Sequence, residues 1–285
     1  MRSDCMYAAK ICIARHMCDL KKDMLMPMDV DLKERRLKEA ERLRKKRSFP
    51  LSLLYYPDYD ASAEIFMELG NSEDDVGKKV EYYEEAAKTY EMGDGEYSRY
   101  LASQAYEKIG EICEETNKRK SVDAYKRSGE YSKQCGRESL AAICFQRAAG
   151  LLKSENEFEE AYVYLNKVVE CYSGSGWKYH RIKAMKDVAE ICIELKRYGE
   201  ASRIYTGVRE SMYLFCAFLC QVIEGVPADT EVGGDEEKLC KAIEEGGDKA
   251  VKAIGEYMLT HAMSKEVKML LEIILEMLQP ENDIL

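Results

Sequence analysis

The residues of this sequence that could do chemistry are few and scattered. There are three His and eleven Cys among 285 residues. Cys12, His16 and Cys18 lie close together, but no second ligand pair with recognisable spacing accompanies them. The Cys residues include no C-x-x-C pair, and their odd number favours reduced thiols, most of them buried as small apolar side chains. We therefore expect no metal site, no cofactor and no disulfide framework.

Catalytic motifs are absent from the sequence as well. It contains no glycine loop followed by Lys and Ser or Thr for phosphate binding, no G-x-S-x-G turn and no H-E-x-x-H helix. Neighbouring carboxylates such as Glu114 and Glu115, or Glu159 and Glu160, have the spacing of a solvated helix surface. The three His have no nucleophile partner nearby in sequence, so we expect a protein that is not an enzyme.

Charge is distributed unevenly along the chain. The formal net charge of -10 predicts that the protein as a whole repels nucleic acid and anionic lipid, although a local basic patch could bind either. Residues 33–47 hold nine basic residues against three Glu, on a predicted helix, and the apolar run 49–56 follows. Such a loop beside a basic helix suits an anionic membrane surface. The alternative is that the loop folds onto the first helix hairpin. The side chains of the loop that would touch the membrane are Phe49, Leu51, Leu53 and Leu54.

The elements that carry these residues are predicted to be helices of near-constant length. Composition favours an all-α protein, with 34% charged residues, 46% hydrophobic residues and five Pro. One large side chain recurs between residues 74 and 211, with successive gaps of 19, 20, 19, 21 and 20. These six residues are Tyr106, Tyr125, Phe145, Tyr164, Met185 and Tyr205.

Small residues flank the first three of these large side chains, four positions away on either side. The flanking residues are Ala102, Gly110, Ser121, Gly129, Ala141 and Ala149. Residues four apart share a helix face, so each ring forms a knob beside two shallow holes, and neighbouring helices can approach closely. Turn residues at 92–95, 116–117, 135–136, 154–156 and 173–176 separate the helices. Two helices make a unit of about 40 residues, longer than the 34-residue tetratricopeptide (TPR) repeat.

The predicted fold is therefore an all-α, TPR-like right-handed α-solenoid of antiparallel helix hairpins, capped by a C-terminal helical bundle. We expect residues 1–27 to form a poorly ordered or loosely docked extension, residues 28–212 the solenoid, and residues 213–285 the bundle with an acidic tail. Three helical segments are predicted in the bundle, at 236–245, 249–261 and 264–279. The last is apolar nearly all round and should be packed within the bundle. The longest apolar run, 212–223, is shorter than the roughly 18 residues of a membrane span.

Several short motifs resemble the soluble NSF attachment proteins, in order and at compatible spacing. Residues 56–63 look like the entry to the second helix of the gamma-type members, and residues 39–41 fit their first helix. Residues 157–161 and 198–201 resemble two later helix starts of the family. The turn at 242–248 resembles one in the family's C-terminal bundle, and the acidic, Leu-terminated tail at 281–285 is similar to that of the alpha-type members.

The resemblance implies an adaptor that binds assembled SNARE complexes and recruits the ATPase NSF for their disassembly in vesicle fusion and intracellular transport. It implies a protein that is a monomer in isolation, cytoplasmic, and peripheral on the cytosolic face of membranes. The residues expected to face NSF are Glu244, Glu245, Asp283 and Leu285. Basic residues expected to face the SNARE bundle, for which an ordinary solvated helix surface is the alternative, are Lys118, Arg119, Lys120, Lys153 and Lys167.

Two other functions compete with this interpretation. One is a generic TPR-like scaffold that holds peptide tails in its groove, in a chaperone or degradation complex. The other is a regulatory enzyme with a helical domain, which requires a pocket of converging titratable groups.

Overall fold

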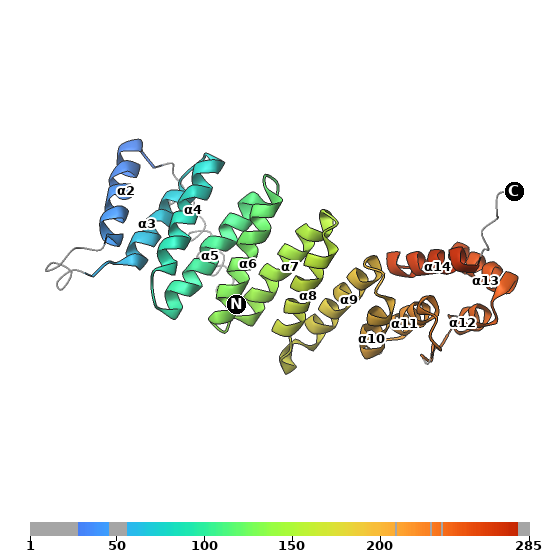
Figure 1. Cartoon of the computed structure of the whole chain (residues 1–285). Helices are drawn as coiled ribbons and strands as arrows, with labels where there is room; N and C mark the ends of the chain where they lie inside the picture. The colour runs from blue at the N-terminus through green and yellow to red at the C-terminus, as the bar shows by residue number, and fades with distance from the viewer. Residues whose placement is uncertain (1–27, 46–55, 209, 229, 235, 279–285) are drawn as a thin grey trace, which may run out of the picture. The chain divides into compact units, whose positions relative to one another are not determined.

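The turn residues of the sequence separate helices along the whole described chain. The computed structural model describes residues 28–45, 56–208, 210–228, 230–234 and 236–278 (Figure 1). These residues form α-helices joined by short turns, with one short 3₁₀ segment, η2, and no strand. Their bounds are α2 Val30–Arg44, α3 Tyr59–Asn71, α4 Val76–Glu91, α5 Glu96–Cys113, α6 Lys118–Gln134, α7 Glu138–Ser154, α8 Phe158–Cys171, η2 Ser175–Trp177, α9 Lys178–Glu194, α10 Tyr198–Val208, α11 Ser211–Glu224, α12 Glu236–Glu245, α13 Gly247–Thr260 and α14 Lys265–Leu278.

Side-chain caps fix several of these helix starts. Asp58 accepts a hydrogen bond from the Ala61 backbone N–H at 3.0 Å, at the start of α3. Asp75 and Asn117 cap α4 and α6 in the same way. Each bond satisfies a backbone donor that the first turn of a helix leaves without a partner. Every predicted turn between residues 92 and 176 falls between two helices of the structure.

The chain divides into two compact units, Met1–Cys144 and Phe145–Leu285, with the boundary inside α7. In the first unit, helices α2 to α6 stand in an antiparallel row, and each packs on the next (Figure 1). The predicted domain boundary at residues 212–213 is a separate division of the chain and stays a prediction.

Close approach of neighbouring helices is visible at two glycines of the first unit. A methyl group added at Gly110 of α5 would lie 2.7 Å from Cε1 of Tyr125 on α6. One added at Gly70 of α3 would lie 2.8 Å from Cε1 of Tyr83 on α4. Real Cβ atoms do not come so close to ring carbons, so each tyrosine ring occupies the space that the missing side chain leaves.

Serine hydroxyls join the same helices through backbone oxygens. Ser121 on α6 donates to the Gly110 carbonyl oxygen at 2.7 Å, and Ser128 donates to the Ser103 carbonyl oxygen at 2.7 Å. Ser62 on α3 donates to the Ala40 carbonyl oxygen of α2 at 2.8 Å. All three hydroxyls are buried, so these bonds both satisfy the serines and require small residues at the contact.

The predicted knobs are confirmed for the aromatic side chains. Tyr106, Tyr125, Phe145, Tyr164 and Tyr205 are all buried. The sixth position differs, because Met185 on α9 is only half-buried. The flanking small residues predicted for the first three helices are buried as well.

The second unit holds α8 to α14. Helices α8, α9, α10 and α11 pack each on the next, α12 packs on α13, and α14 contacts α11 and α13. The three helices predicted for the C-terminal segment lie where they were expected, within two residues at each end.

Helix α14 departs from the expectation of all-round burial. One stripe of it is buried, formed by Val267, Leu270, Leu271 and Ile274. Met277 is 57% exposed, and Ile273 is only half-buried. The helix packs mainly on α11 and α13, and its remaining apolar residues stay partly in contact with solvent.

The cysteines of the described part are free and mostly buried. Seven of these eight are buried, and Cys135 is half-buried. Burial raises the pKa of Cys192 and of Cys216 to about 12, so these thiols stay protonated and unreactive at neutral pH. The cluster of Cys12, His16 and Cys18 lies outside the described residues. None of the helices described is long and apolar enough to cross a membrane.

Burial disfavours the ionised form of two carboxylates on α9. Burial raises the pKa of Asp187 above its ordinary value, even though Lys153, Lys183 and Lys186 act in the opposite direction. Burial likewise raises the pKa of Glu190, whose Oε2 lies 3.3 Å from Nζ of Lys153. Ionisation of either group therefore costs more in the folded chain than in the unfolded one.

Replacing Gly110 with Ala should destabilise the protein by about 1–3 kcal/mol, because the added methyl group collides with the Tyr125 ring. Replacing Gly150 with Ala is the matched control. Gly150 is exposed within α7 and has nothing within 4 Å of an added Cβ, so the higher helix propensity of Ala should stabilise by up to about 1 kcal/mol. Urea denaturation followed by circular dichroism measures both changes. Equal gains for the two variants would contradict the close contact.

Replacing Asp187 with Asn should raise the free energy of unfolding at pH 7 and leave it nearly unchanged at a pH below 3.8, the ordinary pKa of Asp. A carboxyl with a raised folded-state pKa binds its proton more tightly in the folded chain. Its contribution to stability is therefore present at low pH and is lost as the pH rises through the folded-state pKa. Thermal unfolding across this pH range tests the prediction, with the exposed Glu256→Gln variant as control. A loss of stability at pH 7 would contradict it.

Candidate functional site

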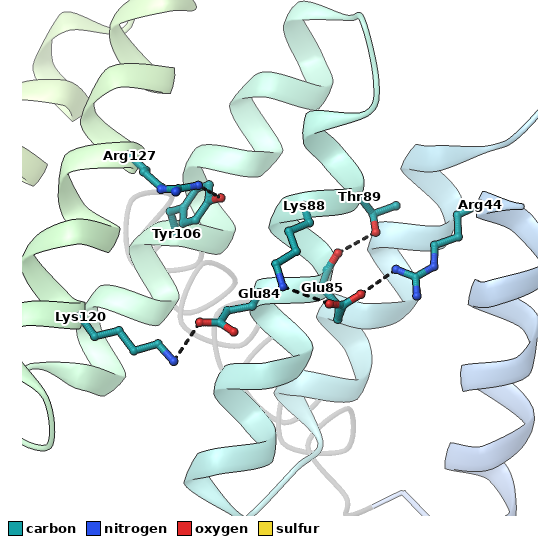
Figure 2. A network of polar contacts seen from close by, with 8 residues as sticks. All are labelled: Arg44, Glu84, Glu85, Lys88, Thr89, Tyr106, Lys120 and Arg127. Carbon is teal, nitrogen blue, oxygen red and sulfur yellow. Dashed lines mark hydrogen bonds and ion pairs between the residues drawn. The ribbon is translucent and has the colours of Figure 1, made fainter.

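Charged side chains of α2, α4 and α6 meet across the first unit. Arg44 on α2 donates from Nη1 to Oε2 of Glu85 on α4 at 2.7 Å, and Lys88 reaches the other oxygen of Glu85 at 3.2 Å (Figure 2). Nζ of Lys120 on α6 lies 2.8 Å from Oε1 of Glu84 (Figure 2). The hydrogen bond from Arg44 holds the pKa of Glu85 below its ordinary value, against the opposing effect of burial. Adjacent residues of α4 thus face helices on opposite sides.

A second group of polar contacts surrounds Oε1 of Glu91, near the end of α4. Tyr106 of α5 donates to this oxygen at 2.6 Å, and Tyr131 of α6 donates to it at 2.9 Å. Nη1 of Arg127 donates to the Tyr106 hydroxyl oxygen at 2.9 Å, and Figure 2 shows its guanidinium beside that ring. The two tyrosine rings are stacked, with centroids 6.0 Å apart.

These two tyrosines act as hydrogen-bond donors and not as bases. Burial, followed by the hydrogen bond to Glu91, raises the pKa of Tyr131 to about 12. The same two causes raise the pKa of Tyr106. Both phenols therefore keep their protons at neutral pH, and they hold the Glu91 carboxylate in a fixed position.

The side chains of α4, α5 and α6 line two adjoining hollows, which we call the α4–α6 groove. The first has a volume of about 310 Å³, and the second about 510 Å³. Their charged lining residues are four cations and four acids: Lys88, Lys120, Lys126, Arg127, Glu84, Glu91, Asp123 and Glu130. Charges of both signs balance, so the groove presents an alternating surface and not a uniformly basic one.

The lining of the groove offers charged and phenolic side chains for polar contacts. Glu84 is paired with Lys120, and Glu91 with Tyr106, Tyr131 and Arg127; neither hollow is lined by a His, a Cys or a Ser that could act as a nucleophile. The described part of the chain also contains no group of three or more His, Cys, Asp or Glu placed to hold a metal ion. A charged partner could exchange these internal ion pairs for pairs with its own side chains.

The predicted SNARE-facing residues have different surroundings. Lys120 lines the α4–α6 groove, and Lys118 and Arg119 are exposed in the first turn of the same helix. Lys153 pairs with Glu190. Lys167 lies over two aromatic rings, with Nζ 5.1 Å from the Phe145 centroid and 5.5 Å from the Tyr164 centroid. Only the three residues at the start of α6 are brought together by one element.

The predicted NSF-facing residues are described in part. Glu244 and Glu245 are exposed at the end of α12, and Oε2 of Glu245 lies 3.0 Å from Nζ of Lys249. Asp283 and Leu285 lie outside the described residues. So do all four side chains predicted to touch a membrane, Phe49, Leu51, Leu53 and Leu54.

Most of the positive charges on α2, the basic helix before that loop, form ion pairs within the chain. Five cations of α2 form ion pairs within the chain, at distances of 2.5–3.3 Å between N and O atoms. They are Lys33, Arg35, Arg36, Lys38 and Arg44. Much of the positive charge of α2 is therefore compensated by carboxylates of the same chain.

Sequence reasoning missed the cluster of Glu91, Arg127 and Tyr131. The spacing of Arg127 and Tyr131 places them on one face of α6, which is a signal that the sequence does contain. The partner Glu91 comes from another helix hairpin, and pairing it with α6 requires the rotation of both helices, which the sequence leaves open.

Comparison with known proteins finds a similarity over part of the chain. Residues 97–215 match the model of the family described as "Soluble NSF attachment protein, SNAP". The alpha-soluble NSF attachment protein of Vitis vinifera is 24% identical over 179 residues, which cover 59% of this chain and 60% of that protein. The match thus spans less than two thirds of the relative's length.

Among solved structures, the crystal structure of BtubC (BKLC) from P. vanneervenii covers 82% of this chain and 95% of its own. Its sequence identity is 16% and its TM-score is 0.35. The matched region 97–215 contains α5 to α10, including the Tyr106 and Arg127 side of the α4–α6 groove. The family match and the curated relative together show that residues 97–215 of this chain are similar to the soluble NSF attachment proteins.

Proposed function

We propose that this protein is an adaptor that binds assembled SNARE complexes and recruits an NSF-type ATPase for their disassembly. The observation that carries the proposal is the family match over residues 97–215, together with the attachment protein from Vitis vinifera. The low identity to that relative leaves the choice of SNARE partners open to experiment. The likeness to gamma-type members, noted for the sequence motifs, also stays a prediction.

Electrostatics support a role in binding an elongated charged partner. The α4–α6 groove exposes cations and carboxylates from two parallel helices, so a helical bundle with its own rows of charge can exchange ion pairs along it. Lys118 and Arg119 add two exposed cations beside the groove, at the start of α6. Because complementary charges accelerate encounter, binding of this kind should weaken as salt rises.

Glu244 and Glu245 support the second half of the proposal. They stand exposed at the C-terminal end of α12, where a basic domain of an ATPase can reach them. Two carboxylates at that position add to the negative end of the helix dipole, and Lys249 compensates one of them. Asp283 and Leu285 are assigned to the same contact from the family resemblance.

Capture experiments with the full chain test the adaptor function. Immobilised protein should retain a preassembled SNARE complex and, in the presence of a non-hydrolysable ATP analogue, NSF. The three components should elute as one complex, and liposomes should increase the yield. Retention of individual SNARE tails with a one-to-one ratio, and no NSF, would favour the peptide-binding scaffold instead.

Reversing Glu244, Glu245 and Asp283 together to Lys should abolish NSF recruitment while SNARE capture and helix content stay unchanged. The reason is that the contact then presents like charges to a basic domain. A triple variant with the same change of net charge is the control: Glu237→Lys, Glu256→Lys and Glu272→Lys, all at exposed carboxylates of α12 to α14. Unchanged recruitment by the first variant, or equal loss in both, would remove the three residues from the contact.

A further inference from the structure

The turn between α8 and α9 carries an exposed aromatic cluster. Trp177 is 40% exposed and Tyr179 is 76% exposed. The ring of His180 is near both, with its centroid 5.2 Å from that of Trp177 and 5.7 Å from that of Tyr179. The buried Tyr172, directly after α8, packs against Trp177 and His180, at centroid distances of 5.6 and 5.3 Å. Large rings are thus held at the surface although a buried ring lies directly beside them.

Positive charge surrounds these rings. Lys178 and Arg181 alternate with the aromatic residues and are exposed. Neither forms an ion pair in the described part of the chain, although the protein carries a net charge of -10. No Asp or Glu occurs anywhere in residues 173–186. We call residues 177–181 the basic–aromatic tip.

The shape of the tip differs from that of a docking face. All five residues from 177 to 181 are exposed, and five consecutive residues cover more than one full helical turn. Side chains therefore project in every direction around the beginning of α9. A folded protein partner buries one face of a helix, whereas a helix end exposed on all sides can insert into the headgroup region of a membrane.

Local electrostatics point to an anionic occupant. Helix α9 begins at Lys178 with no acidic residue in its first turn and no side-chain cap. Cations at this end of a helix are unfavourable, because the backbone dipole already makes it positive. A negatively charged surface would relieve this repulsion. Trp and Tyr rings are enriched at the headgroup level of bilayers, where one part of the ring is dry and another is wet.

We propose that the basic–aromatic tip is a membrane contact that inserts Trp177 and Tyr179 among the headgroups of an anionic lipid surface, with Lys178 and Arg181 bound to lipid phosphates. This contact is distinct from the predicted loop at residues 49–54. It also does not require the proposed SNARE or NSF partners. The protein would then touch a membrane through two separate segments.

Trp177 is the only Trp of the chain, so its fluorescence reports on the tip alone. The full-length protein is mixed with vesicles of phosphatidylcholine containing one third phosphatidylserine, and with vesicles of phosphatidylcholine only. The emission should shift to shorter wavelength and be quenched by brominated acyl chains with the anionic vesicles. Both effects should be weak with the neutral vesicles and should decrease as salt is added.

Replacing Lys178 and Arg181 with Gln should lower the partition coefficient measured by this signal about 30-fold, because each cation near the surface contributes about fivefold. Replacing Lys249 and Lys252 with Gln removes the same charge from exposed positions of α13 and should change nothing. Circular dichroism confirms that each variant is folded. The conservative variant Arg181→Lys should retain the signal.

Three results would overturn the proposal. Vesicles could bind the protein with no change in Trp emission, which would assign binding to another segment. The Gln variant could bind as strongly as the unmodified protein. Emission could respond to soluble polyglutamate with no quenching by brominated lipid, which would identify an acidic protein surface as the occupant. Capture of SNARE complex and NSF without vesicles tests the proposed function separately, so failure of one proposal leaves the other standing.

Discussion

Close packing of helix on helix, made possible by small residues beneath aromatic rings, is the constraint on which the first unit depends. The Tyr125 ring lies where a side chain at Gly110 would be, and Tyr83 lies in the same way against Gly70. Only at this separation can Ser121 reach the Gly110 carbonyl oxygen of the neighbouring helix. The same positions therefore serve van der Waals packing and satisfy buried hydroxyl groups. Larger side chains there would disturb both.

Fixed helix spacing also determines which charges meet. Glu84 and Glu85 are adjacent on α4, yet one pairs with Lys120 of α6 and the other with Arg44 of α2. Several charges that line the groove, among them Glu84, Glu91 and Lys120, already have internal partners, which a charged ligand would have to exchange for its own. Such a surface discriminates by the order of its charges along the helices more than by its net charge.

The sequence predicted much of the fold because its signals are local. Turn residues such as Gly136 and Asn117 end and begin helices through their own backbone and side-chain geometry, so they act without knowledge of the rest of the chain. The aromatic period likewise identified Tyr125 and Tyr205 as core residues. Met185 and α14 were less well predicted, since their burial depends on how many neighbours surround a helix, and composition alone does not give that number.

The candidate site was harder to predict than the fold for a physical reason. Lys120 was identified among basic residues, but its partner Glu84 belongs to a different hairpin, and helix rotation decides whether the two meet. The Glu91 oxygen that accepts from both Tyr106 and Tyr131 depends on three helices at once. The positive run on α2 is evident in the sequence, whereas its pairing with Glu73, Glu68 and Glu85 appears only when α3 and α4 are in place.

The helices of the first unit can assemble one after another during synthesis. Each of helices α2 to α6 packs on a helix that is its neighbour in the sequence, so contacts there link residues that are near in sequence. Chains with such short-range contacts fold quickly, and they do not need distant segments to nucleate. As the chain leaves the ribosome, each new helix can add to a platform already formed by the one before it. This order of assembly keeps exposed apolar surface small throughout synthesis.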